Sequence, residues 1–232
     1  MVAKQIKVAV AILTYNRRNF LERTLDSLLY SAGEYDLFVF DNGSTDGSQQ
    51  LLASLNEAGV FSEVKFNETG IHTAGFGMNR AIEMAMTTKP DLILLSADDY
   101  CYNLNWFNSF IEFWTAANNK IKLVGLNIEP LYPWNEIIDK IECGGQRALL
   151  RTSIGGSQWS FMDDDLDLIY PLREITGGED LEVCRRLINN GHKIAALNLS
   201  EHIGERDSVW GNRSWEYARQ LPSDILDWIG EL

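Results

Sequence analysis

Apolar and polar residues alternate in blocks along the first half of the chain. Continuous apolar runs rich in Val, Ile and Leu are typical of strands covered on both faces. Between them, apolar residues recur every three or four positions, which is the spacing of an amphipathic helix. This pattern predicts strands at residues 6–13, 35–40, 60–66, 91–95 and 121–126, and helices at 20–30, 49–56, 74–86 and 106–117.

Strands that alternate with helices across short connections form parallel sheets with right-handed crossovers. The predicted fold class is therefore α/β, with a mostly parallel, Rossmann-like sheet flanked by helices. The sequence contains no internal repeat and no low-complexity linker. We expect a single domain over residues 1–232.

The second half is less regular. It predicts a strand pair within residues 142–152 with a turn at Gly144-Gly145, a helix at 181–190 and a strand at 193–199. The C-terminal segment places Ile225, Trp228, Ile229 and Leu232 on one helical face, and its other face is acidic. An acidic face is unsuited to an anionic membrane, so we expect this segment to pack on the protein's own core or on the mate of a homodimer.

Composition excludes several classes of protein. The 232 residues carry a formal net charge of −13 and are 45% hydrophobic, which is unlike a disordered chain or a broad basic nucleic-acid surface. No apolar run approaches the roughly 20 residues that span a bilayer, and we expect no transmembrane segment and no signal peptide. The three cysteines are odd in number and widely spaced. They predict free thiols and a cytoplasmic location.

Three polar loops follow predicted strands, at residues 14–18, 41–48 and 96–100. Ligands of such sheets bind outside the carboxyl ends of the strands. Asp98 and Asp99 are adjacent carboxylates of the kind that hold Mg²⁺ or Mn²⁺, although a solvated turn would use the same residues. Asp41 can accept hydrogen bonds from a nucleobase N–H and a ribose hydroxyl, or simply form a turn.

Further candidate residues lie in the second half. Glu179 and Asp180 follow two glycines at a predicted helix start, where the helix dipole stabilises carboxylates. An ionised Asp180 suits a general base, but the same position also suits a purely structural role. His202 follows the last predicted strand and is a candidate metal ligand, with a structural histidine as the alternative. Trp159 could stack on a sugar ring or belong to the core.

Five segments, in order and spacing, resemble the glycosyltransferase family 2 enzymes of GT-A fold. The resemblance spans roughly residues 6–200, and its strength lies in the order rather than in any single motif. The segments are Thr14-Tyr15-Asn16-Arg17, Phe40-Asp41-Asn42-Gly43-Ser44-Thr45-Asp46-Gly47-Ser48, Gly75-Phe76-Gly77-Met78-Asn79-Arg80-Ala81-Ile82, Ser96-Ala97-Asp98-Asp99 and Gly178-Glu179-Asp180.

The resemblance implies a nucleotide-binding half at about residues 1–100, an acceptor half at about 101–210 and a helical tail at about 211–232. It implies that Asp180 is the catalytic base, and that a Mn²⁺ or Mg²⁺ cofactor is held by Asp98, Asp99 and His202. Asn79 and Arg80 would lie near the diphosphate or support the donor loop. The implied acceptor-binding residues are Gly156, Trp159 and Glu179, and the implied donor-binding residues are Thr14, Asn16, Arg17, Asp41, Asn79, Arg80 and Asp98.

The activity implied is an inverting, metal-dependent transfer of a sugar from a nucleoside diphosphate, most simply a UDP-sugar, to the hydroxyl of a glycan, a glycolipid precursor or another acceptor. Ser96 stands where the family usually has its first acid, so cation binding would depend on Asp98, Asp99 and His202. A modified (hydroxymethylated) nucleobase in DNA, as in phages, is an alternative acceptor. It would need a basic patch at Arg147, Arg151 and Arg173.

Two further alternatives concern the reaction itself. A nucleotidyltransferase would need a glycine-rich phosphate loop after the first strand, and the loop here, at residues 14–18, has no glycine. A non-catalytic nucleotide-sugar-binding relative is the other alternative. The retention of Asp98, Asp99 and Asp180 argues against it.

Overall fold

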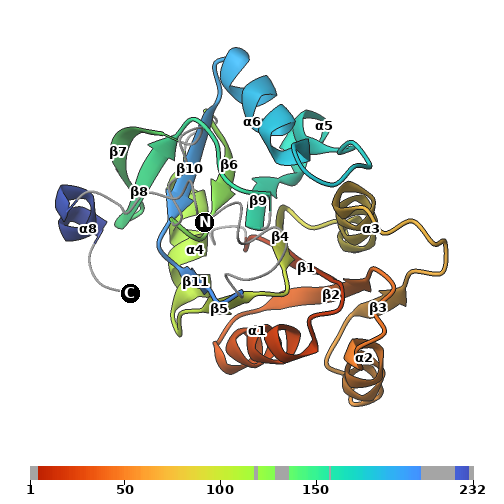
Figure 1. Ribbon diagram of the computed structural model, residues 1–232. Helices are drawn as coiled ribbons and strands as arrows, with labels where there is room; N and C mark the ends of the chain where they lie inside the picture. The colour runs from red at the N-terminus through yellow and green to blue at the C-terminus, as the bar shows by residue number, and fades with distance from the viewer. Residues whose placement is uncertain (1–4, 118–119, 129–135, 157, 205–222, 230–232) are drawn as a thin grey trace.

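The computed structural model describes residues 5–117, 120–128, 136–156, 158–204 and 223–229. Within them, one sheet has the strand order β3-β2-β1-β4-β9-β6-β10-β8-β7 (Figure 1). The strands of this sheet are β1 (Val8–Thr14), β2 (Tyr35–Asp41), β3 (Glu63–Phe66), β4 (Leu92–Ala97), β6 (Ile121–Gly125), β7 (Ile137–Cys143), β8 (Gln146–Arg151), β9 (Gln158–Met162) and β10 (Lys193–Leu197).

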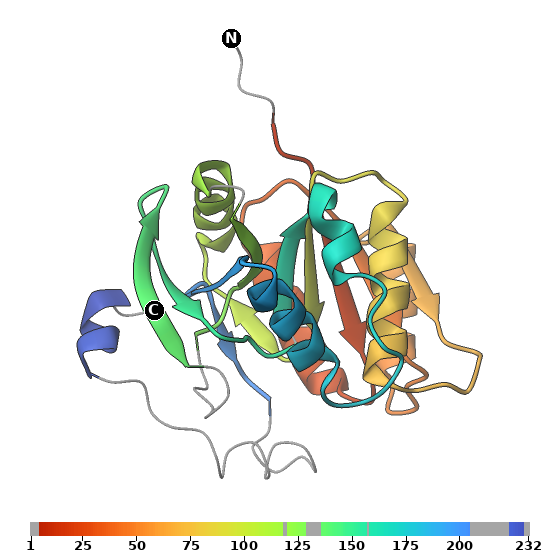
Figure 2. The same cartoon turned by 90° about the horizontal axis from the view of Figure 1, so that it is seen from above.

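Helices cover both faces of the sheet. In Figure 2, α3, α5 and α6 lie in front of it. We call the face of the sheet that packs against α1, α2 and α4 the first face. The second face packs against α3, α5, α6 and α8. The helices are α1 (Arg18–Tyr30), α2 (Ser48–Glu57), α3 (Ala74–Met86), α4 (Trp106–Ala116), α5 (Leu166–Ile169), α6 (Glu179–Asn189) and α8 (Ser223–Ile229), with a short 3₁₀ turn at Asp163–Asp165.

Strand β1 shows why its sequence is a continuous apolar run. Val8, Val10 and Ile12 pack with the helices of the first face, whereas Ala9 and Ala11 pack with those of the second. Alternate residues of a strand point to opposite faces, so a strand covered on both sides has no polar face. Strands β1, β2, β3 and β4 pair in parallel, which confirms the predicted parallel half.

The second half of the sheet mixes parallel and antiparallel pairs. Strand β9 runs antiparallel between β4 and β6, while β10 pairs in parallel with β6. The predicted strand pair is the hairpin β7–β8 with its turn at Gly144-Gly145, but β7 begins at Ile137, earlier than predicted. Strand β7 is partly exposed and carries charged residues, so its sequence shows no clear alternation of apolar and polar positions.

A second, two-stranded sheet joins β5 (Tyr100–Tyr102) and β11 (Ser200–His202) in antiparallel pairing. The pairing sets His202 opposite Tyr100, directly after the Asp98-Asp99 pair. Neither strand is predicted from the sequence, because three-residue strands have no measurable period. This small sheet nevertheless brings the end of the chain's last core strand back to the end of β4.

The C-terminal helix α8 packs on the protein's own fold. Ile225 is buried in the core beside the second face, and Trp228 packs against the same cluster. The charged groups of Lys140 and Arg147 each lie 5.9 Å from the centre of the Trp228 ring. Packing on the chain's own core, one of the two predicted outcomes for this segment, is therefore confirmed for the described part of it.

Two other sequence expectations concern the described residues. Cys101, Cys143 and Cys184 are free thiols, as predicted. No helix in the described ranges is both long enough and apolar enough to cross a membrane.

Candidate active site

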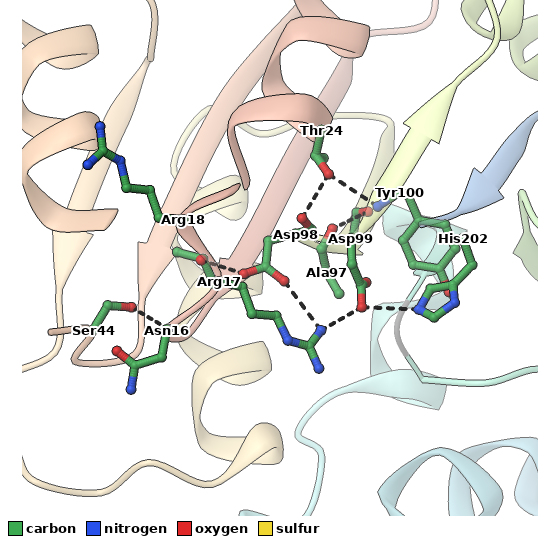
Figure 3. A network of polar contacts seen from close by, with 12 residues as sticks. Asn16, Arg17, Arg18, Thr24, Ser44, Ala97, Asp98, Asp99, Tyr100 and His202 are labelled. Atoms are coloured by element: carbon green, nitrogen blue, oxygen red, sulfur yellow. Dashed lines mark hydrogen bonds and ion pairs between the residues drawn. The ribbon is translucent and has the colours of Figure 1, made fainter. Parts of the chain in front are cut away.

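Three predicted loops meet at one edge of the sheet, because the parallel strands that precede them end in register. Thr14 pairs with Asp41, and Leu13 pairs with Ala97. The loops are also bonded to each other. The backbone N–H of Asn16 donates to Ser44 Oγ at 2.8 Å (Figure 3), and the Asn16 side chain accepts from the Thr45 N–H at 2.7 Å. Asn16, predicted to bind the donor, thus links the first two loops.

Asp98 is held almost completely away from solvent at the end of β4. The Thr14 hydroxyl donates to Asp98 Oδ2 at 2.5 Å. The Thr24 hydroxyl donates to the Asp98 carbonyl at 2.8 Å and accepts from the Tyr100 N–H at 3.1 Å (Figure 3). Burial, followed by the negative charge of Asp99, raises the pKa of Asp98 to about 7 against the opposing effect of Arg17. The charged form of Asp98 is therefore disfavoured in this site, and a further cation nearby would stabilise it.

Asp99 has one engaged and one free oxygen. Its Oδ2 lies 2.5 Å from Arg17 Nη1 and 3.1 Å from His202 Nε2, whereas its buried Oδ1 has no partner in the described structure. Burial alone would raise the pKa of Asp99, but the bond to His202 and the charges of His202 and Arg17 hold it below its usual range. These contacts thus favour the ionised form of Asp99.

The predicted cation site is not preformed. Arg17 Nη1 lies 2.5 Å from Asp99 Oδ2 and 3.6 Å from Asp98 Oδ1, so the guanidinium bridges the pair (Figure 3). In the part of the chain that the structure describes, no group of three or more His, Cys, Asp or Glu side chains is arranged to hold a metal ion. The donor chemistry nevertheless fits Mn²⁺ or Mg²⁺, because Asp99 Oδ1 is an unused buried carboxylate oxygen and His202 adds an imidazole nitrogen.

Asp41 forms the turn that its sequence context suggests, and its ligand-binding role stays a prediction. Its Oδ1 accepts from the N–H groups of Gly43 and Ser44 at 3.0 and 2.8 Å and from Gln49 Nε2 at 3.0 Å, which builds the turn. Gly43 has φ +93°, a conformation that favours glycine. The other carboxylate oxygen, Oδ2, is buried without a partner. It remains able to accept a hydrogen bond from a ligand N–H or hydroxyl.

An aromatic pair beside Asp41 was not singled out from the sequence. The rings of Tyr15 and His72 are stacked with their centres 5.6 Å apart, and Tyr15 is 44% exposed. His72 Nδ1 lies 2.5 Å from the carbonyl oxygen of Asn42. An exposed Tyr in the loop after a buried strand was the available signal. These rings lie at the same edge as Asp41 and offer a flat apolar surface to a planar ligand.

Asp180 lies at the first turn of α6 and is anchored to the start of β9. Its Oδ2 accepts from the Gly156 N–H at 3.1 Å, and its Oδ1 accepts from the Leu181 N–H at 2.7 Å. Because Gln158 pairs with Ser96, Gly156 lies at the same sheet edge as the acidic pair. A Cβ on Gly156 would come 2.9 Å from the Asp180 Cβ, so the glycine permits this approach.

Glu179, the neighbour of Asp180, is buried and keeps an unpartnered Oε2. Burial raises the pKa of Glu179. Buried polar atoms without a partner are uncommon in native structures and call for an explanation. A ligand hydroxyl is one, and the acceptor-binding role of Glu179 stays a prediction.

Asn79 and Arg80 contact the segment that precedes α6. Asn79 Nδ2 donates to the Leu172 carbonyl and Asn79 Oδ1 accepts from the Leu172 N–H, both at 2.9 Å. Arg80 pairs with Glu83 at 2.7 Å and with Glu174 at 3.8 Å. Both side chains bind partners on α3 and in the segment before α6, and a direct diphosphate contact stays a prediction. The supporting role, the other alternative, fits.

Asn79→Ala is expected to lower the free energy of unfolding by about 2–3 kcal/mol, because it leaves a buried N–H and a buried carbonyl of Leu172 without partners. Urea denaturation followed by circular dichroism measures this. Asn108→Ala, which removes only an exposed amide on α4, is the control and should change the value by less than about 0.5 kcal/mol. Equal losses in the two variants would mean that the Leu172 clamp carries no stability.

The structure places Trp159 in the core, so the acceptor-stacking role proposed for it is not supported. The residue lies on β9 opposite Leu95, in the middle of the sheet, and its side chain is fully buried. A ring in that position presents no face to a ligand. The core alternative considered from the sequence is the one observed.

The basic patch needed for a DNA acceptor does not form. Arg151 is 2% exposed and donates to the Ile128 carbonyl at 2.7 Å. Arg147 donates to the Trp228 carbonyl, and Arg173 pairs with Glu182. Because one of the three side chains is buried and the other two are engaged elsewhere, they offer no shared surface to phosphates.

The family model Glycosyl transferase family 2 matches residues 9–127. No curated protein matches the sequence.

Among solved structures, the mannosyltransferase PcManGT from Pyrobaculum calidifontis, in complex with GDP-Man and Mn²⁺, aligns at a TM-score of 0.63 and 14% identity over 88% of this chain and 59% of that one. TarS 1–349 from S. aureus aligns at 0.59 and 18% identity, over 83% and 58%. GalNAc-T7 with UDP, GalNAc and Mn²⁺ aligns at 0.66 and 13% identity, over 88% and 45%. The chain thus spans about half the length of these structures, and the likeness concerns the fold.

Proposed function

The chain belongs to glycosyl transferase family 2, and from this we propose that it transfers a sugar from a nucleoside diphosphate to an acceptor hydroxyl with inversion at the anomeric carbon. The GT-A fold expected from the sequence is confirmed. The observation that carries the proposal is the meeting of Asp41, Asp98, Asp99 and Asp180 at the carboxyl ends of the strands. Ligands of open α/β sheets bind at that edge.

The donor would lie over the ends of β1, β2 and β4. Asp41 Oδ2 is a buried acceptor for the base or ribose, and Tyr15 and His72 supply a stacking surface beside it. Structures of similar fold contain GDP-Man or UDP together with Mn²⁺, which supports a nucleotide-sugar donor and a divalent cation. We take a UDP-sugar as the first donor to test. When bound, a cation supplies positive charge that stabilises the leaving diphosphate, and Asp98, Asp99 and His202 are the residues that would hold it.

Asp180 would act as the base. Two backbone N–H groups donate to its carboxylate, and it lies in the first turn of α6, so the side chain is held in place at the sheet edge. The carboxylate takes the proton of the acceptor hydroxyl while that oxygen bonds to the anomeric carbon. The bond between that carbon and the diphosphate oxygen breaks in the same step. A single displacement of this kind inverts the configuration.

The alternatives to this reaction lack support. A nucleotidyltransferase disagrees with the family to which the chain belongs. A DNA acceptor has no shared basic surface at the three arginines that it would need. The acceptor is therefore sought first among glycans, glycolipid precursors and other small hydroxyl compounds.

A ligand screen tests the donor site. Melting temperature is measured with UDP, GDP, TDP or CMP, and with their sugars, each with and without Mn²⁺. A ligand at a hundred times its Kd stabilises by about 2.7 kcal/mol, which for a chain of this size raises the melting temperature by several degrees. We expect such a shift for one base, larger with Mn²⁺ than without. Absence of any shift with every nucleotide would overturn the proposed donor site.

A further inference from the structure

The Arg17 guanidinium stands where a cation would have to bind. It bridges Asp99 Oδ2 at 2.5 Å and Asp98 Oδ1 at 3.6 Å (Figure 3). We propose that Arg17 is an internal counterion of the acidic pair, which a divalent cation displaces on entering, and that the displaced side chain then pairs with the donor diphosphate. This inference rests on the proposed function and adds to it an exchange of one cation for another.

The acidic pair needs a positive partner in the ligand-free protein. Asp98 and Asp99 are 2% and 3% exposed, and burying adjacent carboxylates without a counterion is costly. Thr14 gives Asp98 only a neutral hydrogen bond. In the described structure, Arg17 is the cationic side chain that contacts both carboxylates. Arg17 therefore supplies, within the chain, the charge that a bound metal would otherwise supply.

Arg17 and a metal ion compete for the same oxygen. Asp99 Oδ2 contacts both Arg17 Nη1 and His202 Nε2, so the oxygen nearest the predicted imidazole ligand is the one that the guanidinium occupies. Two cations on that oxygen would repel each other strongly in a buried setting. Gly204 borders this pair, since a Cβ there would lie 2.7 Å from Asp99 Oδ2 and 2.8 Å from His202 Nε2. Only a residue without a Cβ fits this close to Asp99 and His202.

The Arg17 side chain can leave without unfolding its loop. The loop is anchored by backbone bonds, in which the N–H groups of Phe20 and Leu21 donate to the Arg17 carbonyl at 3.0 and 2.9 Å. Asn16 separately ties the loop to Ser44 and Thr45. The Arg17 side chain itself is 37% exposed, so part of it already reaches solvent. Exchange therefore requires a rotamer change rather than a rearrangement of the backbone.

The released guanidinium has a ready partner. With a cation held by the acidic pair, a diphosphate bound to that cation would lie close to the position that Arg17 leaves. Arginine binds phosphate oxygens in a bidentate manner, with paired charge-assisted hydrogen bonds. The same side chain thus neutralises the acids in the empty site and the diphosphate in the filled site. The negative charge at this edge of the sheet is therefore compensated in both states.

Mn²⁺ affinity of the ligand-free protein tests the exchange directly. Titration calorimetry, or the electron paramagnetic resonance signal of free Mn²⁺, is compared for the wild type, Arg17→Gln and Arg18→Gln. Arg18 is the matched control because it is the next residue in the chain, at the start of α1, carries the same charge and points away from the acids (Figure 3). We expect Arg17→Gln to bind Mn²⁺ about tenfold more tightly, equivalent to about 1.4 kcal/mol, and Arg18→Gln to bind as the wild type does.

Arg17→Lys, which keeps the charge but loses the planar fork, is expected to fall between Arg17→Gln and the wild type. UDP should also raise the Mn²⁺ affinity of the wild type by a larger factor than that of Arg17→Gln. Only in the wild type can the Arg17 guanidinium move from the acids to pair with the diphosphate. Folding of each variant is checked by its melting temperature. The proposed exchange is overturned if Arg17→Gln and the wild type bind Mn²⁺ with equal affinity, or if Arg17→Gln and Arg18→Gln gain Mn²⁺ affinity equally. It is also overturned if none of the proteins binds Mn²⁺. If UDP with Mn²⁺ still binds, the proposed function survives that failure.

Discussion

Asp180→Asn is expected to lower kcat by about a thousandfold, because a positioned general base contributes roughly 10²- to 10⁴-fold and an amide cannot take a proton. Asn has nearly the same shape, and one of the two bonds from Gly156 and Leu181 can persist on its carbonyl oxygen. The nucleotide-binding residues at the ends of β1, β2 and β4 are untouched. Donor affinity should therefore remain within about twofold of the wild type. Steady-state kinetics of sugar transfer measure kcat, and nucleotide titration measures donor affinity.

Glu182→Gln is the matched control for Asp180→Asn. It removes one negative charge from the same turn of α6, but its surface pair with Arg173 is long, at 3.5 Å, and exposed. Surface pairs of this kind contribute little, so turnover should stay within about twofold of the wild type. If Asp180→Asn keeps normal turnover, Asp180 is not the base. If both variants lose activity equally, the loss reflects the charge of the helix end rather than proton transfer.

The first half of the fold was predictable because its physics is local. A strand covered on both faces, such as β1, has no polar side, and its flanking helices show a clear apolar stripe. Since parallel strands end at a common edge, the meeting of the loops after Thr14, Asp41 and Ala97 followed from the order of elements alone. The sequence therefore identified the site edge before any contact was known.

The second half was less predictable because its pairings are non-local. Strand β9 inserts antiparallel between β4 and β6, and no local signal reports a partner far along the chain. The same limit explains Trp159 and Arg151. Residue type allows Trp159 to be a ligand platform or a core ring, and Arg151 to be a phosphate contact or a buried donor. Only the sheet order, which buries both, decides between these alternatives.

Within the site, residue type indicated the acids but not their partners. Asp98 and Asp99 were identified as an acidic pair, and His202 was considered as a third ligand beside them. The β5–β11 pairing, which the sequence does not reveal, is what brings His202 to 3.1 Å from Asp99. Arg17 was implied to bind the donor, and its bridge between the two carboxylates emerges only from the geometry. Contacts across strands are thus the missing information.

Asp99→Asn is expected to reduce Mn²⁺ affinity by at least about tenfold and kcat/KM by about a hundredfold. Asp99 Oδ1 is the buried oxygen that has no partner in the described structure, and Asp99 Oδ2 is the oxygen that faces His202. Asparagine retains one neutral acceptor and replaces the other oxygen with an N–H donor, which cannot ligate a cation. A cation held by Asp99 would stabilise the charge of the leaving diphosphate in the transition state, an effect of several kcal/mol. Loss of the Asp99 charge weakens this stabilisation. Titration calorimetry and initial rates at saturating Mn²⁺ measure the two effects.

Asp139→Asn, an exposed change on β7 at the far end of the sheet, is the control and should alter neither quantity. The two readouts separate the causes of any loss, since Asp99 also anchors Arg17 and His202. If rates fall while Mn²⁺ affinity is unchanged, Asp99 acts by holding its neighbours, and the cation is bound elsewhere. If both remain normal, the acidic pair is not the cation site. A fall in both, with the melting temperature retained, is the result that a cation on Asp99 requires, because only then does the same charge govern ligand affinity and catalysis.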